Sequence, residues 1–163
     1  MTNETFLSTY LVRKFKVFML ESNKIEGENR INSDDIEACW YAYNNPLDKI
    51  EYILYLHSLL GRYLQKPWVG KLRDVDVRVG DYYPPAPEEV ETLMIAYCKS
   101  LPNLDSWTAH NNFERIHPFE DLNGRVGRLI WLNKAKKEGY RFGIPFLQKY
   151  YYQTLEKEEK RYI

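Results

Sequence analysis

Residues 117–128 constrain the fold of this chain more than any other stretch, because they join two helical patterns through one short polar loop. The stretch reads His-Pro-Phe-Glu-Asp-Leu-Asn-Gly-Arg-Val-Gly-Arg. Pro118 disfavours the helical conformation at His117, so the preceding helix should end just before the imidazole and leave it at the mouth of a loop. Asn123 and Gly124 form a turn signal, and an apolar helical pattern begins directly after them. The sequence therefore predicts a helix, a loop and a second helix.

Polar side chains gather in this loop in a combination that suits phosphate groups. A helix N-terminus presents unpaired N–H groups and the positive end of the helix dipole to an anion. Arg125 and Arg128 project from one face of the first turn, and two planar guanidinium groups suit a polyphosphate better than one carboxylate. Asp121 would be repelled by that anion unless a divalent cation such as Mg²⁺ bridges the two. His117, at the loop mouth, is free to act as a base.

The stretch resembles the signature of the Fic family, which reads His-Pro-Phe, any residue, Asp or Glu, Gly, Asn, Gly or Lys, Arg, two residues, Arg. The resemblance implies that His117 deprotonates a hydroxyl of a target protein and that Asp121 holds Mg²⁺ or Mn²⁺. It also implies that Asn123 and the loop amides bind the α-phosphate of ATP, while Arg125 and Arg128 bind the outer phosphates. The catalytic set is then His117, Asn123, Arg125 and Arg128. The residues assigned to nucleotide and metal are Asp121, Leu122, Asn123, Gly124, Arg125 and Arg128.

The activity that the resemblance implies is transfer of AMP from Mg-ATP to a Tyr, Ser or Thr hydroxyl of a protein. One position departs from the signature. Leu122 stands where the family usually has Gly, and a positive φ there would cost a Leu about 1–2 kcal/mol. The related Doc branch carries Ala at this position and transfers phosphate. Two alternatives therefore stay open: a nucleotide-binding module with lost chemistry, or transfer of another group such as UMP, phosphate or phosphocholine.

Composition and charge favour one compact soluble domain over residues 1–163. The chain is 44% hydrophobic and 15% aromatic, which is sufficient for one core. Lys plus Arg and Asp plus Glu number 23 each, so the overall charge points neither to nucleic acid nor to an anionic membrane as a partner. The N-terminus lacks a signal-peptide pattern, and no apolar run is long enough to cross a bilayer. We therefore expect a cytoplasmic protein.

Helical periodicity predicts most of the secondary structure. The expected helices cover residues 6–19, 33–44, 48–64, 88–100, 104–116, 124–138 and 145–158. His57 and His110 lie within these patterns, and we interpret both as core histidines because no metal-ligand spacing accompanies them. Val75, Val77 and Val79 alternate with charged residues, which is typical of a strand. This segment interrupts an otherwise helical chain.

The alternating segment, bounded by Gly70 and Gly80, predicts a small β-hairpin flap over residues 70–83. A hairpin of this size adds little to a core. In Fic proteins the flap borders the active site and docks the target protein by strand addition, which suits an exposed strand edge. The expected fold is an all-α, mainly helical Fic-type domain with this flap. Its catalytic core would cover residues 31–163, after an N-terminal helix and inhibitory segment over residues 1–30.

The inhibitory segment is predicted from Ser-Asn-Lys-Ile-Glu-Gly at residues 22–27. It resembles the Fic inhibitory motif, which reads Ser or Thr, three residues, Glu, then Gly or Asn. The resemblance implies that Glu26 pairs with Arg128 and keeps it from the γ-phosphate, while Ser22 ties the helix in place. Gly27 completes the motif and would end the helix. The residues alone leave another interpretation open, a capped helix end with a solvated Glu26.

Inhibition of this kind is an equilibrium, because two anions compete for one guanidinium group. Relief could come from a change of oligomeric state, from a metal or from a nucleotide. A homo-oligomer and self-modification both stay open. In the same pocket Glu26 could orient a water molecule, so removal of AMP from the modified protein is a second expected activity.

Overall fold

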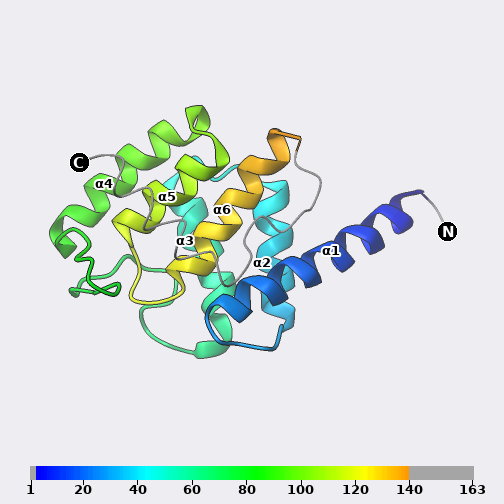
Figure 1. Ribbon diagram of the computed structural model, residues 1–163, viewed down its shortest axis with the longest axis horizontal. Helices are drawn as coiled ribbons and strands as arrows, with labels where there is room; N and C mark the ends of the chain where they lie inside the picture. The colour runs from blue at the N-terminus through cyan, green and yellow to red at the C-terminus, as the bar shows by residue number, and fades with distance from the viewer. Residues whose placement is uncertain (1–2, 140–163) are drawn as a thin grey trace.

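The computed structural model describes the backbone of residues 3–139 and the side chains of residues 8–139. Its α-helices are α1 (Asn3–Ile25), α2 (Ser33–Asn44), α3 (Ile50–Gly61), α4 (Pro87–Ser100), α5 (Ser106–Ile116) and α6 (Asn123–Lys137), shown in Figure 1. Two 3₁₀ turns, η1 (Arg62–Leu64) and η2 (Leu101–Asn103), continue α3 and α4. The predicted all-α fold is confirmed, and the helix expected at residues 145–158 lies outside the described part. No helix in the described part has both the length and the apolar character needed to cross a membrane.

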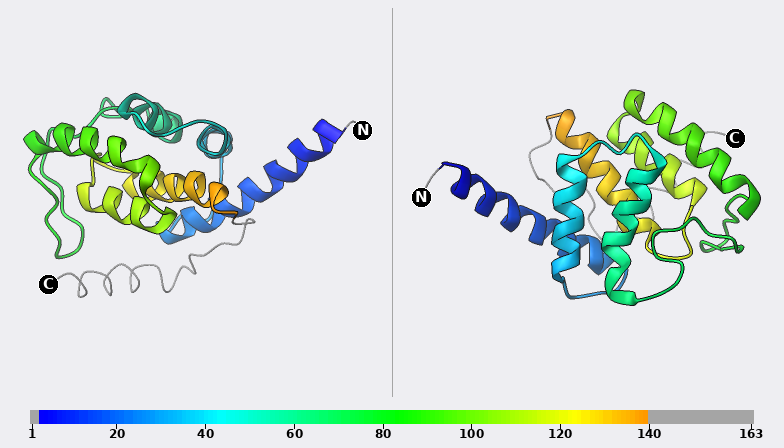
Figure 2. Two further views of the ribbon diagram at one scale, coloured as in Figure 1. Left: turned by 90° about the horizontal axis from the view of Figure 1, so that it is seen from above. Right: turned by 180° about the vertical axis from the view of Figure 1, so that it is seen from behind.

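Helix α6 is the central element of the bundle. It contacts α1, α2, α3 and α5, and Figures 1 and 2 show these helices packed around it. Only the N-terminal part of α1 extends away from the other helices in these views. Every residue of α6 from Arg125 to Ala135 is buried, as expected for a helix covered on all sides. Val126, Leu129 and Ile130, which belong to the apolar pattern that follows Gly124, are fully buried.

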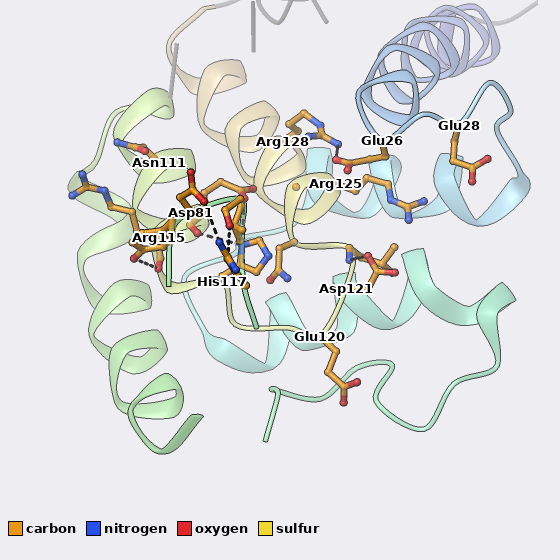
Figure 3. Close-up of a pocket in the computed structure, with 18 residues that line it drawn as sticks. Glu26, Glu28, Asp81, Asn111, Arg115, His117, Glu120, Asp121, Arg125 and Arg128 are labelled. Carbon is orange, nitrogen blue, oxygen red and sulfur yellow. Dashed lines mark hydrogen bonds and ion pairs between the residues drawn. The ribbon is translucent and has the colours of Figure 1, made fainter. Parts of the chain in front are cut away.

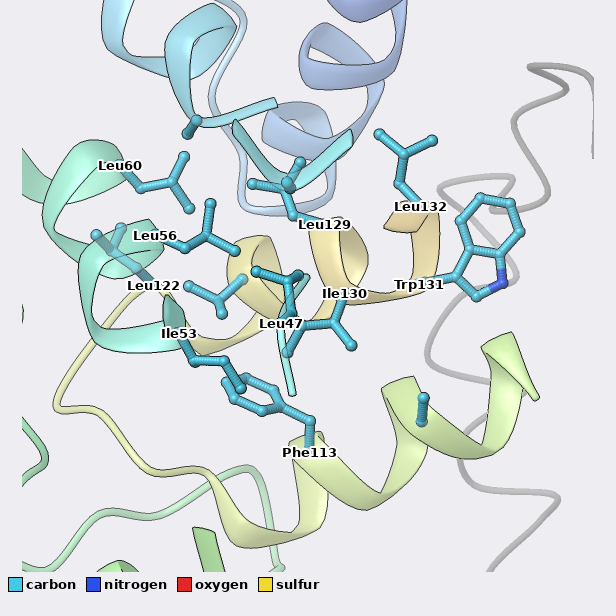
Figure 4. Close-up of a cluster of buried hydrophobic side chains, with 14 of the residues drawn as sticks. Leu47, Ile53, Leu56, Leu60, Phe113, Leu122, Leu129, Ile130, Trp131 and Leu132 are labelled. Atoms are coloured by element: carbon cyan, nitrogen blue, oxygen red, sulfur yellow. The ribbon is translucent and has the colours of Figure 1, made fainter. Parts of the chain in front are cut away.

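The core also holds the loop that precedes α6. Phe119 and Leu122 are 0% and 3% exposed, and Figure 4 shows Leu122 beside Ile53, Leu56 and other apolar side chains of α3. Each buried aliphatic side chain contributes about 1.5–3 kcal/mol relative to an exposed one. Packing of these two side chains therefore fixes the loop at two points, while Glu120 and Asp121 between them stay exposed.

Local interactions set the helix ends that matter for the site. Helix α2 begins after Asn32, whose side chain accepts from the Asp35 N–H while Asp35 accepts from the Asn32 N–H, each at 2.9 Å. Helix α5 ends at Ile116, where Pro118 predicted its end. His117 follows in the left-handed conformation, with φ 49 and ψ 60. The imidazole therefore leaves the helix at a sharp turn.

The predicted strand pairing of the flap is wrong. Within residues 70–83, hereafter the flap segment, the structure has a single antiparallel bridge, between Val79 and Tyr82, and no paired strands. The two residues exchange N–H···O bonds of 3.0 and 2.9 Å. The returning arm then meets Pro84 and Pro85, which have no N–H group to continue a ladder. The flap segment is consequently an extended loop.

A buried arginine fixes this loop to the bundle. Arg73 is 3% exposed, and its guanidinium donates to the carbonyls of His117 (2.8 Å), Val75 (3.0 Å) and Pro85 (2.6 Å). Its main-chain N–H donates to the Pro118 carbonyl at 2.9 Å. Main-chain carbonyls thus provide the hydrogen bonds that the buried guanidinium charge requires. These bonds also fix the flap segment to the start of the 117–128 loop.

Candidate active site

A cavity of about 970 Å³ opens at the N-terminal end of α6. Its walls come from the turn after α1, the tip of the flap segment, α5 and the 117–128 loop. Figure 3 shows Glu26 against Arg128 with Arg125 beside them, while His117 and Asp121 lie lower in the view. Segments far apart in sequence thus bring a base, two guanidinium groups and carboxylates to one cavity.

The start of α6 presents an anion site. Leu122 precedes the helix in the left-handed conformation, with φ 68 and ψ 6, and no side chain caps the helix. The first helical bond runs from the Val126 N–H to the Leu122 carbonyl at 3.0 Å. The N–H groups of the first turn have no helical carbonyl to bond, so they can bind an anion. Leu122 therefore provides the positive φ for which the family signature uses Gly.

The side chain of Asn123 bonds to the main chain of its own loop. Its side-chain oxygen accepts from the Phe119 N–H at 2.9 Å, and its side-chain amide donates to the Phe119 carbonyl at 2.8 Å. It is 2% exposed. The side chain therefore closes the loop, and any contact of Asn123 with a phosphate would come from its main-chain N–H.

His117 is held as a neutral base. Its Nδ1–H donates to the Glu114 main-chain carbonyl at 3.3 Å, which leaves Nε2 to accept a proton. Burial lowers the pKa of His117 below its ordinary value; the Glu114 carbonyl opposes this, Arg73 lowers the pKa further, and Glu26 and Asp121 raise it. A general base must be unprotonated before reaction, so the net lowering suits that role.

The two arginines of the loop have different partners. Arg128 is 1% exposed; its Nε donates to Ser22 Oγ at 2.7 Å, and its Nη2 donates to the Ser22 carbonyl at 3.0 Å and to Glu26 Oε1 at 2.6 Å. Arg125 donates only to the Tyr63 hydroxyl, at 3.3 Å, and its Nε has no hydrogen-bond partner within the described residues. Arg125 is thus available to an anion, whereas Arg128 is held by Ser22 and Glu26.

The predicted contact of residues 22–27 with Arg128 is present. Helix α1 ends at Ile25, and Gly27 takes the left-handed conformation with φ 80, as expected at a helix end. A Cβ at Gly124 would lie 2.6 Å from Glu26 Oε1 and 2.9 Å from Arg128 Nη1. A glycine is therefore required at Gly124 for the carboxylate to reach the guanidinium in this arrangement.

Asp121 suits a cation that arrives with a nucleotide. It is exposed at the cavity, and one of its oxygens, Oδ1, accepts from the Leu122 N–H at 2.6 Å. Residues 8–139 contain no group of three or more side chains able to hold a metal. Mg²⁺ commonly uses one or two protein carboxylates together with substrate phosphates and water. The donor set therefore fits Mg²⁺ shared with phosphates.

His57, predicted to be a core histidine, is confirmed as one and also supports the loop. The Gly70 N–H donates to its Nδ1 at 2.9 Å, so its Nε2–H donates to the Asp121 carbonyl at 3.2 Å. The ring stacks on Phe119 with centroids 3.8 Å apart. Burial lowers the pKa of His57 to about 4, which keeps it neutral. His110 is also fully buried.

Sequence reasoning missed two residues beside the base. Arg73 carries no local signal, because the carbonyls that tie it to the site, those of His117 and Pro85, are distant from it in sequence. Glu114 did carry one, since it precedes His117 by three positions on a predicted helix, a spacing that places side chains together. Its carboxylate Oε2 lies 3.7 Å from His117 Nδ1.

Together these features define, over the described residues, a helical domain whose central helix begins at a cavity beside the His117 imidazole. A model of the Fic/DOC family matches residues 46–133, more than half of the chain, and the chain belongs to this family.

The chain is similar to longer proteins named Protein adenylyltransferase Fic. It is 29% identical over 126 residues to the one from Nematostella vectensis, covering 69% of this chain and 28% of that protein. It is 29% identical over 134 residues to the one from Drosophila melanogaster, covering 74% of this chain and 27% of that protein. The chain therefore spans less than a third of the length of these relatives.

Solved structures share the fold. A Fic family protein from Desulfovibrio desulfuricans G20 superposes with a TM-score of 0.74 at 22% identity, covering 97% of this chain and 61% of that one. Fic-1 from C. elegans superposes with a TM-score of 0.68 at 19% identity, covering 93% of this chain and 57% of that one.

Proposed function

We propose that this protein transfers AMP from Mg-ATP to a Tyr, Ser or Thr hydroxyl of a protein. The observation that carries the proposal is the cavity in which the open start of α6, the Arg125 guanidinium and the neutral His117 meet. Such a site positions a polyphosphate next to a base, and phosphoryl chemistry depends mostly on positioning and charge neutralisation. The names of the relatives support the same activity.

The proposed reaction assigns one step to each group. Nε2 of His117 takes the proton of the target hydroxyl while its oxygen bonds to the α-phosphorus, and the bond from that phosphorus to pyrophosphate breaks. The N–H groups of the first turn of α6 bind the α-phosphate, and Arg125 binds the departing phosphates. Mg²⁺ at Asp121 would neutralise phosphate charge. The target protein would lie along the flap segment, where Val75 and Val79 are 45% and 37% exposed.

We also propose that Glu26 restrains this reaction. While Glu26 and Ser22 hold Arg128, the guanidinium cannot bind the γ-phosphate. ATP would then bind with its phosphates turned away from in-line attack, and even a displacement of about 1 Å can cost about 100-fold in rate. Displacement of the segment, by a change of oligomeric state, a metal or a nucleotide, would restore activity.

Labelling with two forms of ATP tests the transfer and the restraint together. ATP labelled at the α-phosphate should label the protein itself or a lysate protein weakly with wild type and strongly with Glu26→Gly. Glu28→Gly, the same change two residues away at the cavity edge, should match wild type. Adding His117→Ala to Glu26→Gly should lower labelling by at least about 100-fold. ATP labelled at the γ-phosphate should label nothing.

The possible outcomes distinguish this proposal from its alternatives. Label from the γ-phosphate would indicate phosphate transfer, as in the Doc branch, and mass spectrometry of the product would identify UMP or phosphocholine. No label with Glu26→Gly, despite ATP binding, would leave a nucleotide-binding module without chemistry. Equal labelling by wild type and Glu26→Gly would contradict the restraint.

Removal of AMP is the second activity that we propose for the same cavity. Glu26 would accept a proton from a water molecule that attacks the phosphorus, and His117 would return a proton to the departing target oxygen. The labelled product of the first experiment can measure it once ATP is removed. Wild type should then release the label as AMP, and Glu26→Gly should not.

A further inference from the structure

Glu114 lies against the side of His117 that faces away from the proposed reaction. It belongs to the last turn of α5, and its side chain is 14% exposed. Its carboxylate Oε2 is 3.7 Å from His117 Nδ1, and its main-chain carbonyl accepts from the same Nδ1–H at 3.3 Å. The other oxygen, Oε1, is buried and has no hydrogen-bond partner within the described residues.

Gly127 of α6 makes the space that the carboxyl occupies. A Cβ at Gly127 would clash with Glu114 Oε1 and would lie 3.0 Å from His110 Nδ1. Any larger residue would push the carboxyl out of this position. Glycine costs about 1 kcal/mol relative to alanine inside a helix, so its presence in the buried part of α6 is explained by the close approach of Glu114.

The surroundings of Glu114 favour a carboxyl that titrates near neutrality. Burial raises the pKa of Glu114 to about 7, with Arg128 opposing this rise and Glu26 adding to it. The charged or titratable groups around Glu114 and His117 are Glu26 from the turn after α1, Arg73 from the flap segment, Tyr97 from α4, His110 from α5, Asp121 from the loop and Arg128 from α6. Because Glu114 and His117 are this close, their titrations are coupled.

We propose that Glu114 is a positioning residue for His117: its carboxylate, behind Nδ1, stabilises the positive charge that the ring gains when Nε2 accepts the proton of the target hydroxyl. This inference rests on the proposed function. The proton leaves the hydroxyl oxygen as that oxygen bonds to phosphorus, and the imidazolium then has Nδ1–H directed at the Glu114 carbonyl with the carboxylate close by. In a partly buried site this negative charge raises the pKa of His117, which burial and Arg73 lower.

A titration of the imidazole tests this without measuring transfer. The pKa of His117, followed by NMR, should fall by about one unit in Glu114→Gln, because the variant removes a negative charge and keeps the shape. Glu91→Gln removes the same charge from an exposed position of α4 and should leave the pKa of His117 unchanged. An unchanged value in Glu114→Gln would overturn the proposal, since a carboxyl that only fills space would not alter the titration.

Kinetics give an independent measurement in the Glu26→Gly background. A base with a lower pKa stays unprotonated at lower pH, so Glu114→Gln should shift the acid limb of kcat/KM by about one unit to lower pH. The maximal rate should fall about tenfold, because a weaker base removes the proton less readily. A lower rate with an unmoved acid limb would indicate a structural role and overturn the proposal.

The same inference can be tested in the wild-type chain, which removes any dependence on the folding of the variant. The Glu114 carboxyl carbon and the His117 ring should both report the two apparent pKa values of a coupled pair. Titration of Glu114 without any response of the His117 ring would contradict the inference. If the ring responds but no variant transfers AMP, the coupling stands and the proposed function fails.

Discussion

Leu122 combines a left-handed backbone, at φ 68, with a side chain that is 3% exposed. The left-handed conformation costs a residue with a Cβ about 1–2 kcal/mol, and burial of a leucine contributes about 1.5–3 kcal/mol. Its Cδ1 packs closely against α3, since a Cβ at Gly61 would be 3.2 Å from it, and Figure 4 shows Leu122 beside Leu56 and Ile53. Core packing therefore offsets the strain, and the backbone keeps the shape that a glycine would give it.

Leu122→Gly should accordingly leave the rate of transfer unchanged and lower stability. Loss of the buried side chain costs about 2–5 kcal/mol, and relief of strain returns about 1–2 kcal/mol. Urea denaturation gives the free energy of unfolding, and labelling in the Glu26→Gly background gives the rate. Leu56→Ala is the matched control, because it weakens the same part of the core without altering the loop. A rate increase of tenfold or more in Leu122→Gly alone would show that Leu122 distorts the site.

From the residues alone, the side chains that meet in the site were predictable only where spacing along the chain determines it, whereas the contact of Glu26 with Arg128 was expected from the family resemblance. His117, Arg125 and Arg128 were identified because loop and helix start place them within a few positions of one another. The bonds of His57 to Gly70 and Asp121 join segments more than ten residues apart in sequence. No pattern in one sequence reports such partners, so the support of the loop became visible only in the folded structure.

The buried side chain of Asn23 fixes the turn after α1. Asn23 is 3% exposed, and its amide donates to the Arg30 carbonyl at 2.8 Å and to Asp35 Oδ2 at 3.1 Å. Its main-chain carbonyl accepts from the N–H groups of Glu26 at 2.9 Å and Glu28 at 3.0 Å. The Asn23 side chain thus ties the end of α1 to the start of α2, and Glu26 is presented from the turn between them.

Asn23→Ala should partly release the proposed inhibition. The variant removes both amide bonds of the turn but leaves Glu26 in place, so transfer should rise toward the level of Glu26→Gly without reaching it. In the Glu26→Gly background the same change should have no further effect, because the restraint is already absent. Asn32→Ala is the control for a weakened start of α2 and should cause a smaller rise. Additive effects of Asn23→Ala and Glu26→Gly would contradict this interpretation.

Elements were predicted well where periodicity extends over several turns, and poorly where pairing was needed. The helices from residue 3 to residue 137 follow apolar spacing and local caps, which a sequence displays directly. The alternation of Val75, Val77 and Val79 has the correct period for a strand but says nothing about a partner. With Pro84 and Pro85 on the returning arm, pairing stops at the bridge between Val79 and Tyr82.

At the scale of the molecule, the N-terminal helix and the proposed nucleotide site are linked through one guanidinium. Helix α1 contacts α6, and the turn after α1 delivers Glu26 to Arg128 at 2.6 Å. If Glu26 and a γ-phosphate exclude each other, ATP must weaken the binding of the turn as much as the turn weakens ATP. ADP has no γ-phosphate, so its affinity should not depend on Glu26.

Thermal unfolding with each nucleotide in the presence of Mg²⁺ measures this link. A tenfold gain in ATP affinity on changing Glu26→Gly corresponds to about 1.4 kcal/mol, or roughly 3–5 °C in Tm for a domain of this size. ATP should therefore raise the Tm of Glu26→Gly by that much more than the Tm of wild type, each measured against its own nucleotide-free protein. ADP should raise the Tm of wild type and the Tm of Glu26→Gly equally. ATP should also raise the two Tm values equally once Arg128→Ala is added to each protein. Equal shifts with ATP in wild type and Glu26→Gly would mean that Arg128 does not bind the γ-phosphate.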